Sequence, residues 1–190
     1  MMSVARSALA LACGWALLAA PAQAAAPHHG DAPLQGLGGP LDLTADDGRL
    51  FTAERLQGRP ALLFFGYTHC GTSCPVALVA AKQVVALSSV MRAPTILFVT
   101  LDPLADDPEH LRDYLSHFDR RFVGLTGTPE QVERVARRFG VGHELREGTL
   151  AHSARWYLLD GEGRLVRTYA LSTPAEDLRD DAQRLSGGMP

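Results

Sequence analysis

Two cysteines with three residues between them constrain this chain more than any other feature. They occur as Cys70 and Cys74 in the stretch FFGYTHCGTSCPVAL. Just before them, Ala61–Phe65 is a continuous apolar run of strand length, which suits a strand covered on both faces. Pro75 stands where a following helix would have its first position. The sequence therefore predicts that the pair lies at a strand-to-helix turn.

The first residues have the layout of a secretory signal peptide. Arg6 precedes an uncharged apolar stretch, which leads to Pro21 and the small-residue pattern Ala22-Gln23-Ala24. We expect residues 1–24 to be removed on export. A retained anchor is the alternative, because the uncharged stretch is nearly long enough to span a bilayer. Cys13 lacks the flanking residues of a lipid-attachment signal, which would place Leu three positions before it and a polar tether after it.

Cleavage would leave a chain of single-domain length, which is long enough to form a stable hydrophobic core without disulfide bonds or a structural metal. Residues 25–40 are rich in Ala, Pro and Gly, so we expect a flexible lead-in. His28 and His29 fall there and are interpreted as solvated. We expect residues 41–190 to form one folded domain. A formal net charge of −3 without a basic stripe argues against nucleic-acid binding.

Strand and helix patterns alternate along this domain. Strands are expected at 41–50 (a hairpin turning at Asp47-Gly48), 61–65, 95–101, 143–147, 155–160 and 164–169, and helices at 76–90, 107–118, 128–139 and 175–185. Thr128 and Gln131 form the sequence signature of a capping box. The alternation predicts an α/β fold. A cysteine pair after the first buried strand indicates a thioredoxin-like fold, with a central mixed sheet flanked by helices and an N-terminal β-hairpin addition.

The small spacing of the cysteines indicates chemistry rather than a structural staple. A disulfide stabilises most when it closes a long loop, and this one would constrain almost nothing. A helix N-terminus favours thiolate, the form that attacks disulfides and binds metals. Two thiolates suit Cu(I), and a nearby imidazole would complete a site that can also hold Cu(II). Zinc would need a fourth ligand. Redox and metal chemistry both remain open at this point.

Five histidines in the domain are candidates for that imidazole: His69, His110, His117, His143 and His152. His69 adjoins Cys70, so we expect its side chain to point to the other side of the loop. His110 and His117 belong to a polar helix and are interpreted as solvated, and His143 lies in a strand-like segment. His152 lies in an expected loop ahead of an apolar strand and is the candidate ligand.

Four motifs in order resemble the Sco/SenC family, the copper-handling proteins named for synthesis of cytochrome c oxidase. They are FFGYTHCGTSCPVAL at 64–78, VTLDP at 99–103, FVGLTGTPEQVERVARRFGV at 122–141 and AHSARWYLLDGEGRLV at 151–166. The resemblance runs from about residue 41 to the C-terminus. It implies a thioredoxin-like domain and a copper site formed by Cys70, Cys74 and His152. It also implies that Asp102, in the DP motif beside the site, supports the site or contacts a partner.

The loop departs from the family pattern C-P-D-x-C-P, because Gly71 and Thr72 replace the Pro and the Asp. The resemblance implies delivery of copper to, or reduction of the cysteines of, the binuclear copper centre of a haem-copper oxidase. The expected location is the periplasm or the outer face of the bacterial inner membrane. Expected partners are the subunit with that centre, or another periplasmic copper protein, and a thiol reductant. The alternative is a thiol–disulfide reductase acting through the redox pair Cys70 and Cys74. A monomer is expected.

Overall fold

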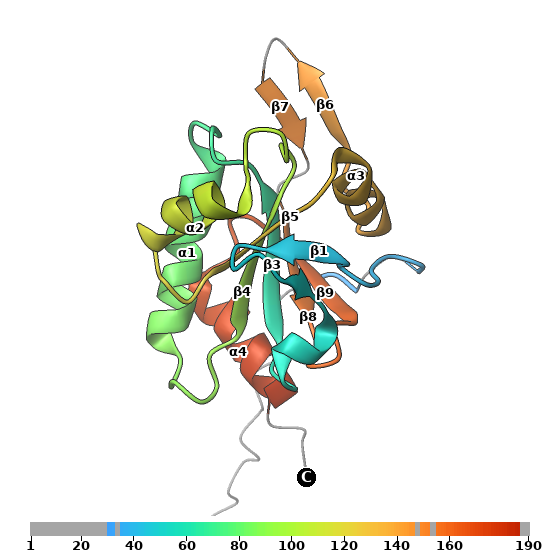
Figure 1. Ribbon diagram of the computed structural model, residues 1–190. Coiled ribbons are helices and arrows are strands. Elements are labelled where there is room, and N and C mark those ends of the chain that lie inside the picture. The colour runs from blue at the N-terminus through green and yellow to red at the C-terminus, as the bar shows by residue number, and fades with distance from the viewer. Residues whose placement is uncertain (1–29, 33–34, 147–148, 153–154, 187–190) are drawn as a thin grey trace, which may run out of the picture.

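A mixed sheet of seven strands carries helices on both of its faces (Figure 1). The computed structural model of the chain describes residues 30–32, 35–146, 149–152 and 155–186, with the backbone alone for 143–146 and 149–152. The predicted signal peptide, Cys13, His28 and His29 lie outside the described residues. Signal cleavage therefore stays a prediction.

The order of elements follows the predicted alternation of strands and helices. The strands are β1 (Leu43–Ala45), β2 (Leu50–Phe51), β3 (Ala61–Gly66), β4 (Thr95–Thr100), β5 (Val123–Thr126), β6 (His143–Arg146), β7 (Thr149–His152), β8 (Arg155–Leu159) and β9 (Leu165–Ala170). The helices are the 3-10 helix η1 (Ala53–Leu56), α1 (Ser73–Leu87), α2 (Pro108–Ser116), α3 (Pro129–Arg138) and α4 (Ala175–Ser186). The main sheet has the strand order β2-β1-β5-β4-β3-β8-β9.

Strand β3 is an interior strand of the sheet, as its apolar sequence predicts. It pairs in parallel with β4 and antiparallel with β8, and all of its residues are buried. Its side chains alternate between two hydrophobic clusters, with Leu63 and Phe65 in one and Leu62 and Phe64 in the other. Both faces of the sheet are therefore covered, and the thioredoxin-like α/β prediction is confirmed.

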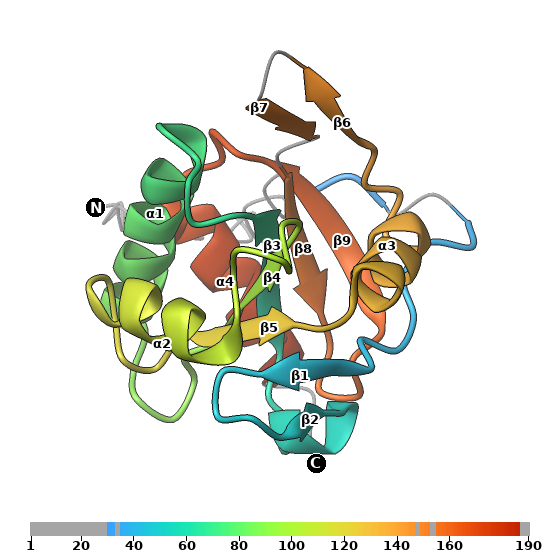
Figure 2. The ribbon, with the colours of Figure 1, turned by 45° about the horizontal axis from the view of Figure 1, so that its top comes forward.

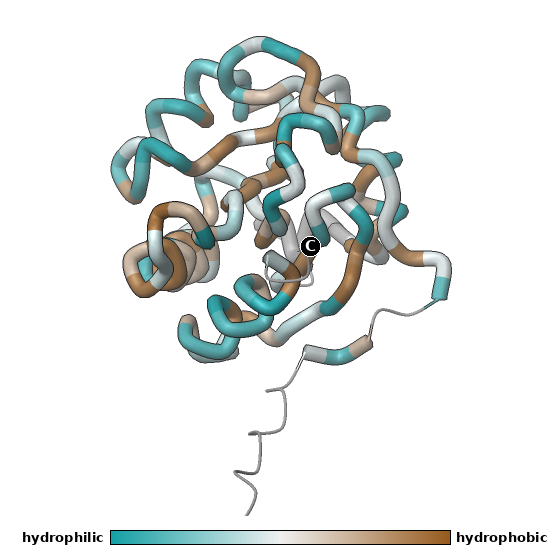
Figure 3. The backbone as a smooth tube through the Cα atoms, turned by 90° about the horizontal axis from the view of Figure 1, so that it is seen from below, coloured by the Kyte–Doolittle hydropathy of each residue, from teal (hydrophilic) through white to brown (hydrophobic). Residues whose placement is uncertain are grey.

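Helices α1, α2 and α4 cover one face of the sheet, and α3 and η1 cover the other (Figures 1 and 2). Figure 3 colours the backbone by hydropathy and shows hydrophobic and hydrophilic stretches alternating along the chain. Helix α3 begins with the predicted capping box, in which the Thr128 N–H donates to the Gln131 Oε1 at 2.7 Å and the Gln131 N–H donates to the Thr128 Oγ1 at 3.3 Å. Gly140 follows this helix with φ +67°, a left-handed conformation that suits glycine.

The N-terminal strands join the sheet through a strand that the sequence did not predict. Strand β1 pairs antiparallel with β2 on one side and with β5 on the other. Strand β5 also pairs in parallel with β4 and so connects the N-terminal pair to the core. Its four residues are a short run that contains a glycine, which is uncommon in strands, and the sequence prediction missed it for that reason.

Strand β7 falls in the loop that the sequence predicted between two late strands, and it pairs with β6, which the sequence predicted as a strand at 143–147. His143 and His152 are register partners in this antiparallel pair. In Figures 1 and 2 the β6–β7 pair lies at the same end of the molecule as the start of α1. His152 therefore ends a strand, rather than lying in a loop as expected.

Described parts of the expected lead-in contact the domain. The Asp31 N–H donates to the Thr168 carbonyl at 2.9 Å, and the Thr168 N–H donates back at 3.1 Å. The Gly38 N–H donates to the Arg138 carbonyl at 2.7 Å. Among the described residues, no helix combines the length and the apolar character needed to cross a membrane.

Candidate metal centre

The two cysteines lie where the chain leaves β3 and enters α1. The Cys70 N–H donates to the Tyr67 carbonyl at 3.2 Å, so a turn presents Cys70 ahead of the helix. The helix begins at Ser73, two residues before Pro75, where the sequence predicted its first position, and Cys74 is its second residue. Both thiols are free; Cys70 is half-buried and Cys74 is fully buried. The Cys70 Sγ lies 3.0 Å from the Ser73 Oγ.

Gly66, the last residue of β3, makes room for the buried thiol. A Cβ at this position would lie 2.7 Å from the Cys74 Sγ and 3.0 Å from ring carbons of both Phe64 and Phe98. The Cys74 sulfur therefore lies over the end of β3, between the strand and the first turn of α1. Any side chain at residue 66 would displace this sulfur or the two rings.

The two thiols differ in acidity. Burial opposes ionisation of Cys70, but the Cys74 thiol, the Ser73 hydroxyl and nearby backbone N–H groups together lower the pKa of Cys70. Burial raises the pKa of Cys74 to about 12, and contact with Cys70 adds to this effect. The expectation that the helix N-terminus favours thiolate therefore holds for Cys70 and is wrong for Cys74, where desolvation dominates.

A buried carboxylate that the sequence analysis missed holds the residues ahead of Cys70. Asp106 is fully buried in the connection between β4 and α2. Its carboxylate accepts hydrogen bonds from the Thr68 N–H at 3.0 Å, the Thr68 hydroxyl at 2.5 Å and the Thr100 hydroxyl at 2.6 Å. It thus ties the β3–α1 loop to the β4–α2 loop.

His69 and His110 meet at the outer side of this network, and neither contacts a thiol in any described interaction. Their rings stack with centroids 5.9 Å apart. The Thr68 Oγ1 lies 3.2 Å from the His69 Nδ1 and 3.0 Å from the His110 Nε2. His69 thus points toward Thr68, in line with the expectation that it does not face the cysteines. His117 donates from its Nδ1 to the Asp113 carbonyl at 2.9 Å.

The predicted ligand His152 is placed only through its backbone, at the end of β7, because its side chain lies outside the described part of the structure. Asp102 lies in the β4–α2 connection, where its N–H donates to the Thr100 hydroxyl at 2.9 Å. Among the described residues, no three side chains of His, Cys, Asp or Glu form a metal-binding group. The structure therefore brings Cys70 and Cys74 together, and the third ligand stays a prediction.

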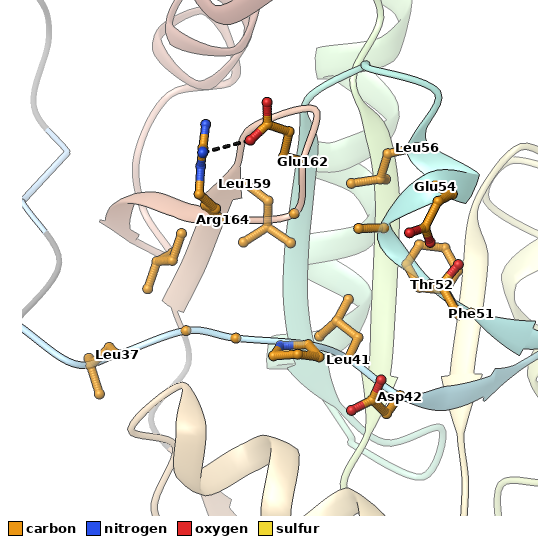
Figure 4. A pocket seen from close by; sticks show the side chains of 16 residues that line it. Leu37, Leu41, Asp42, Phe51, Thr52, Glu54, Leu56, Leu159, Glu162 and Arg164 are labelled. Carbon is orange, nitrogen blue, oxygen red and sulfur yellow. Dashed lines mark ion pairs between the residues drawn. The ribbon is translucent and has the colours of Figure 1, made fainter.

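A separate cavity of about 650 Å³ lies between the η1 region and the turn that joins β8 to β9 (Figure 4). Leu41, Phe51 and Leu56 are among its lining residues, and the Arg164 Nη1 pairs with the Glu162 Oε2 at 2.6 Å. Its lining contains neither cysteine nor histidine. This cavity therefore offers no soft ligand and is not the candidate metal centre.

A mixed sheet with a free dithiol at the start of the helix after its central strand defines a thioredoxin-like dithiol protein. The family model described as SCO1/SenC matches residues 30–187. The chain therefore belongs to the SCO1/SenC family, and the resemblance read from the four motifs is confirmed.

Named relatives agree with this assignment. The chain is 30% identical over 152 residues to a SCO2-like protein of Rickettsia conorii, covering 76% of this chain and 74% of that protein. It is 35% identical over 139 residues to the human mitochondrial SCO1 homolog, covering 68% of this chain and 46% of that protein. The solved structure of Bradyrhizobium japonicum ScoI with copper bound has a TM-score of 0.68 at 34% identity, covering 78% of this chain and 99% of that chain. Arabidopsis thaliana ScoI with copper bound gives a TM-score of 0.70 at 32% identity, covering 79% and 98%.

Proposed function

We propose that this chain is an exported copper-binding metallochaperone whose metal ligands are Cys70, Cys74 and His152. It delivers copper to, or prepares the cysteines of, the binuclear copper centre of a haem-copper oxidase. The observation that carries the proposal is the free thiol pair at the start of α1, in a fold that relatives with bound copper share. Two adjacent thiolates are ligands that Cu(I) prefers.

The different environments of the thiols suggest an order for copper transfer. Cys70 is the more accessible thiol and has the lowered pKa, so it is the first to contact incoming copper and the last to release it. Cys74 is buried, and its binding to copper expels a proton that the protein otherwise retains. Ligand exchange through Cys70 then passes the metal to a partner's thiolates.

A thiol–disulfide reductase is the second candidate, and the same asymmetry favours it. The Cys70 thiolate would attack a client disulfide and form a mixed disulfide. Cys74, losing its proton, would then displace the client as a dithiol and leave a Cys70–Cys74 disulfide. A thiol reductant must return the pair to the dithiol state. The buried, poorly acidic Cys74 suits the role of the second, resolving thiol.

Export belongs to the proposal as well. Residues 1–24 contain a positive charge, an apolar stretch and an A-x-A cleavage pattern, in that order. This layout supports secretion to the periplasm, where the protein would meet a partner with a copper centre. A SCO1/SenC family lipoprotein of Bacillus anthracis has a TM-score of 0.72 to this chain, so a membrane-attached location is the alternative. N-terminal sequencing of the protein from a periplasmic extract should begin at Ala25; an intact N-terminus in the membrane fraction would refute cleavage.

Anaerobic titration of the reduced chain with Cu(I) tests the proposal. We expect one Cu(I) per chain for the wild type and loss of tight binding in Cys70→Ser and Cys74→Ser. His152→Ala removes a proposed ligand and should weaken binding at least as much as the loss of a residue that only supports a ligand, which costs about 10- to 100-fold. The matched control is His143→Ala, because His143 is the register partner of His152 in the β6–β7 sheet.

Each outcome of this titration assigns a role. Weakening by His143→Ala alone would move the third ligand to His143. Weak binding that no histidine variant changes would refute the copper site and leave the reductase. In that case the metal-free dithiol should reduce a model disulfide, and Cys74→Ser should trap the mixed disulfide at Cys70.

A further inference from the structure

We propose that Asp106 is a positioning residue for the thiol pair. Its buried carboxylate fixes the turn that presents Cys70 and so sets where this sulfur stands relative to Cys74. The inference rests on the proposed function only for its copper-binding readout. The thiol–disulfide readout described below needs no metal.

The carboxylate holds Thr68 at two points. One oxygen accepts the hydroxyl proton at 2.5 Å, and the other accepts the backbone N–H at 3.0 Å. Thr68 is therefore fixed in both its backbone and its side chain. The neighbouring Tyr67 carbonyl accepts the Cys70 N–H at 3.2 Å, so the turn is held at both ends.

The carboxylate itself is anchored to rigid elements. The Thr100 hydroxyl, at the end of β4, donates to the Asp106 Oδ2 at 2.6 Å and accepts the Asp102 N–H at 2.9 Å. The Asp106 N–H donates to the Asp102 carbonyl at 2.9 Å. Strand β4 is an interior strand of the sheet and is therefore rigid. Through its hydrogen bonds to Thr100 and Thr68, Asp106 fixes the position of the cysteine loop relative to this strand.

The Thr68 hydroxyl has no spare hydrogen-bonding capacity. Its single proton goes to Asp106, so the two imidazole nitrogens facing its oxygen, the His69 Nδ1 and the His110 Nε2, must act as donors. Removing the hydroxyl would leave a buried carboxylate oxygen with one donor fewer, which is costly in a buried site. The network therefore has little freedom to rearrange, which fits a role in holding the loop ahead of Cys70 in one position.

Asp106→Asn tests the proposal, because the amide keeps the size of the side chain but offers one acceptor oxygen in place of two. The Asn NH₂ then faces groups that are donors themselves. We expect Cu(I) affinity to fall by about 10- to 100-fold, the usual effect of changing a residue that orients a ligand.

In metal-free protein equilibrated with glutathione, the two thiols give up two electrons and two protons to oxidised glutathione and form the Cys70–Cys74 disulfide. We expect this equilibrium to shift by about tenfold toward the dithiol, because a released loop no longer holds Cys70 beside Cys74.

Threonine variants separate positioning from simple destabilisation. Thr68→Val removes the hydroxyl and should shift both readouts in the same direction as Asp106→Asn. Thr68→Ser keeps the hydroxyl and should restore them. Thr126→Val is the matched control, because the Thr126 hydroxyl is buried on β5 without a hydrogen-bond partner among the described residues.

Thermal unfolding measured alongside shows which variants are folded. If Asp106→Asn does not fold, the Thr68→Val and Thr68→Ser pair decides. A lower unfolding temperature with unchanged Cu(I) affinity and an unchanged glutathione equilibrium would overturn the proposal. If the wild type fails to bind Cu(I), the proposed function fails, and the glutathione equilibrium still tests Asp106.

Discussion

At the scale of single residues, the two thiols share a motif but have opposite electrostatic environments. The pKa of Cys70 is lowered in the folded chain, so its ionisation stabilises the fold above the ordinary thiol pKa. That contribution is lost as pH falls through the lowered value. The pKa of Cys74 is raised to about 12, so its effect is the reverse: it favours the fold below the ordinary pKa and disappears as pH rises toward 12.

This asymmetry predicts selective alkylation of the reduced, metal-free chain by iodoacetamide. Cys70 should react with an apparent pKa below that of an ordinary cysteine, because its thiolate is stabilised and accessible. Cys74 should stay unmodified until the pH approaches about 12 or the chain unfolds. Mass spectrometry against pH measures both, and the Cys70→Ser and Cys74→Ser variants assign the reacting thiol. Equal rates for the two thiols at neutral pH would contradict the prediction.

At the scale of elements, the approach of β3 to α1 depends on the absence of a side chain at Gly66. Gly66→Ala should destabilise the fold by about 1–3 kcal/mol through overpacking against the Cys74 Sγ, Phe64 and Phe98. Gly71→Ala is the control, because a Cβ there meets nothing within 4 Å, and its effect should stay within about 0.5 kcal/mol. Urea unfolding measures both variants. Equal losses of stability would show that helix packing at Gly66 is looser than described.

The sequence predicted those helices and strands that are specified by neighbouring residues along the chain. The apolar run gave β3, and the pairing of Thr128 with Gln131 gave the start of α3. Strands β5 and β7 were missed, because short strands are specified by their partners in the sheet rather than by their own residues. The thiol pair was predictable as a motif, whereas Asp106 was not. Its role depends on burial and on Thr68 and Thr100, which lie near it only in the folded chain.

At the scale of the whole molecule, both faces of the sheet are filled by side chains. One hydrophobic cluster joins the sheet to α3 and η1, and the other joins it to α1, α2 and α4. The second cluster contains Cys74, yet its remaining members are apolar or aromatic side chains that need no metal. The Tyr169 hydroxyl donates to the Asp181 carboxylate at 2.8 Å and helps to fix α4 against β9. The fold is therefore expected to form before copper binds, unlike small domains that depend on a structural metal.

Removal of copper should accordingly leave a folded chain of lower thermal stability. Binding to the native state alone stabilises by mass action, by about 2.7 kcal/mol when free Cu(I) is 100 times the dissociation constant. Calorimetry of the reduced chain with and without Cu(I) should show one cooperative transition in both cases, at a higher temperature with the metal. Under the proposed copper site, Cys74→Ser should abolish the shift and keep the transition, because it removes a proposed ligand while changing one atom of one buried side chain. An absent transition in the metal-free wild type would mean that copper is part of the fold, and the chain would then have to bind its cargo while folding rather than exchange it from a preformed site.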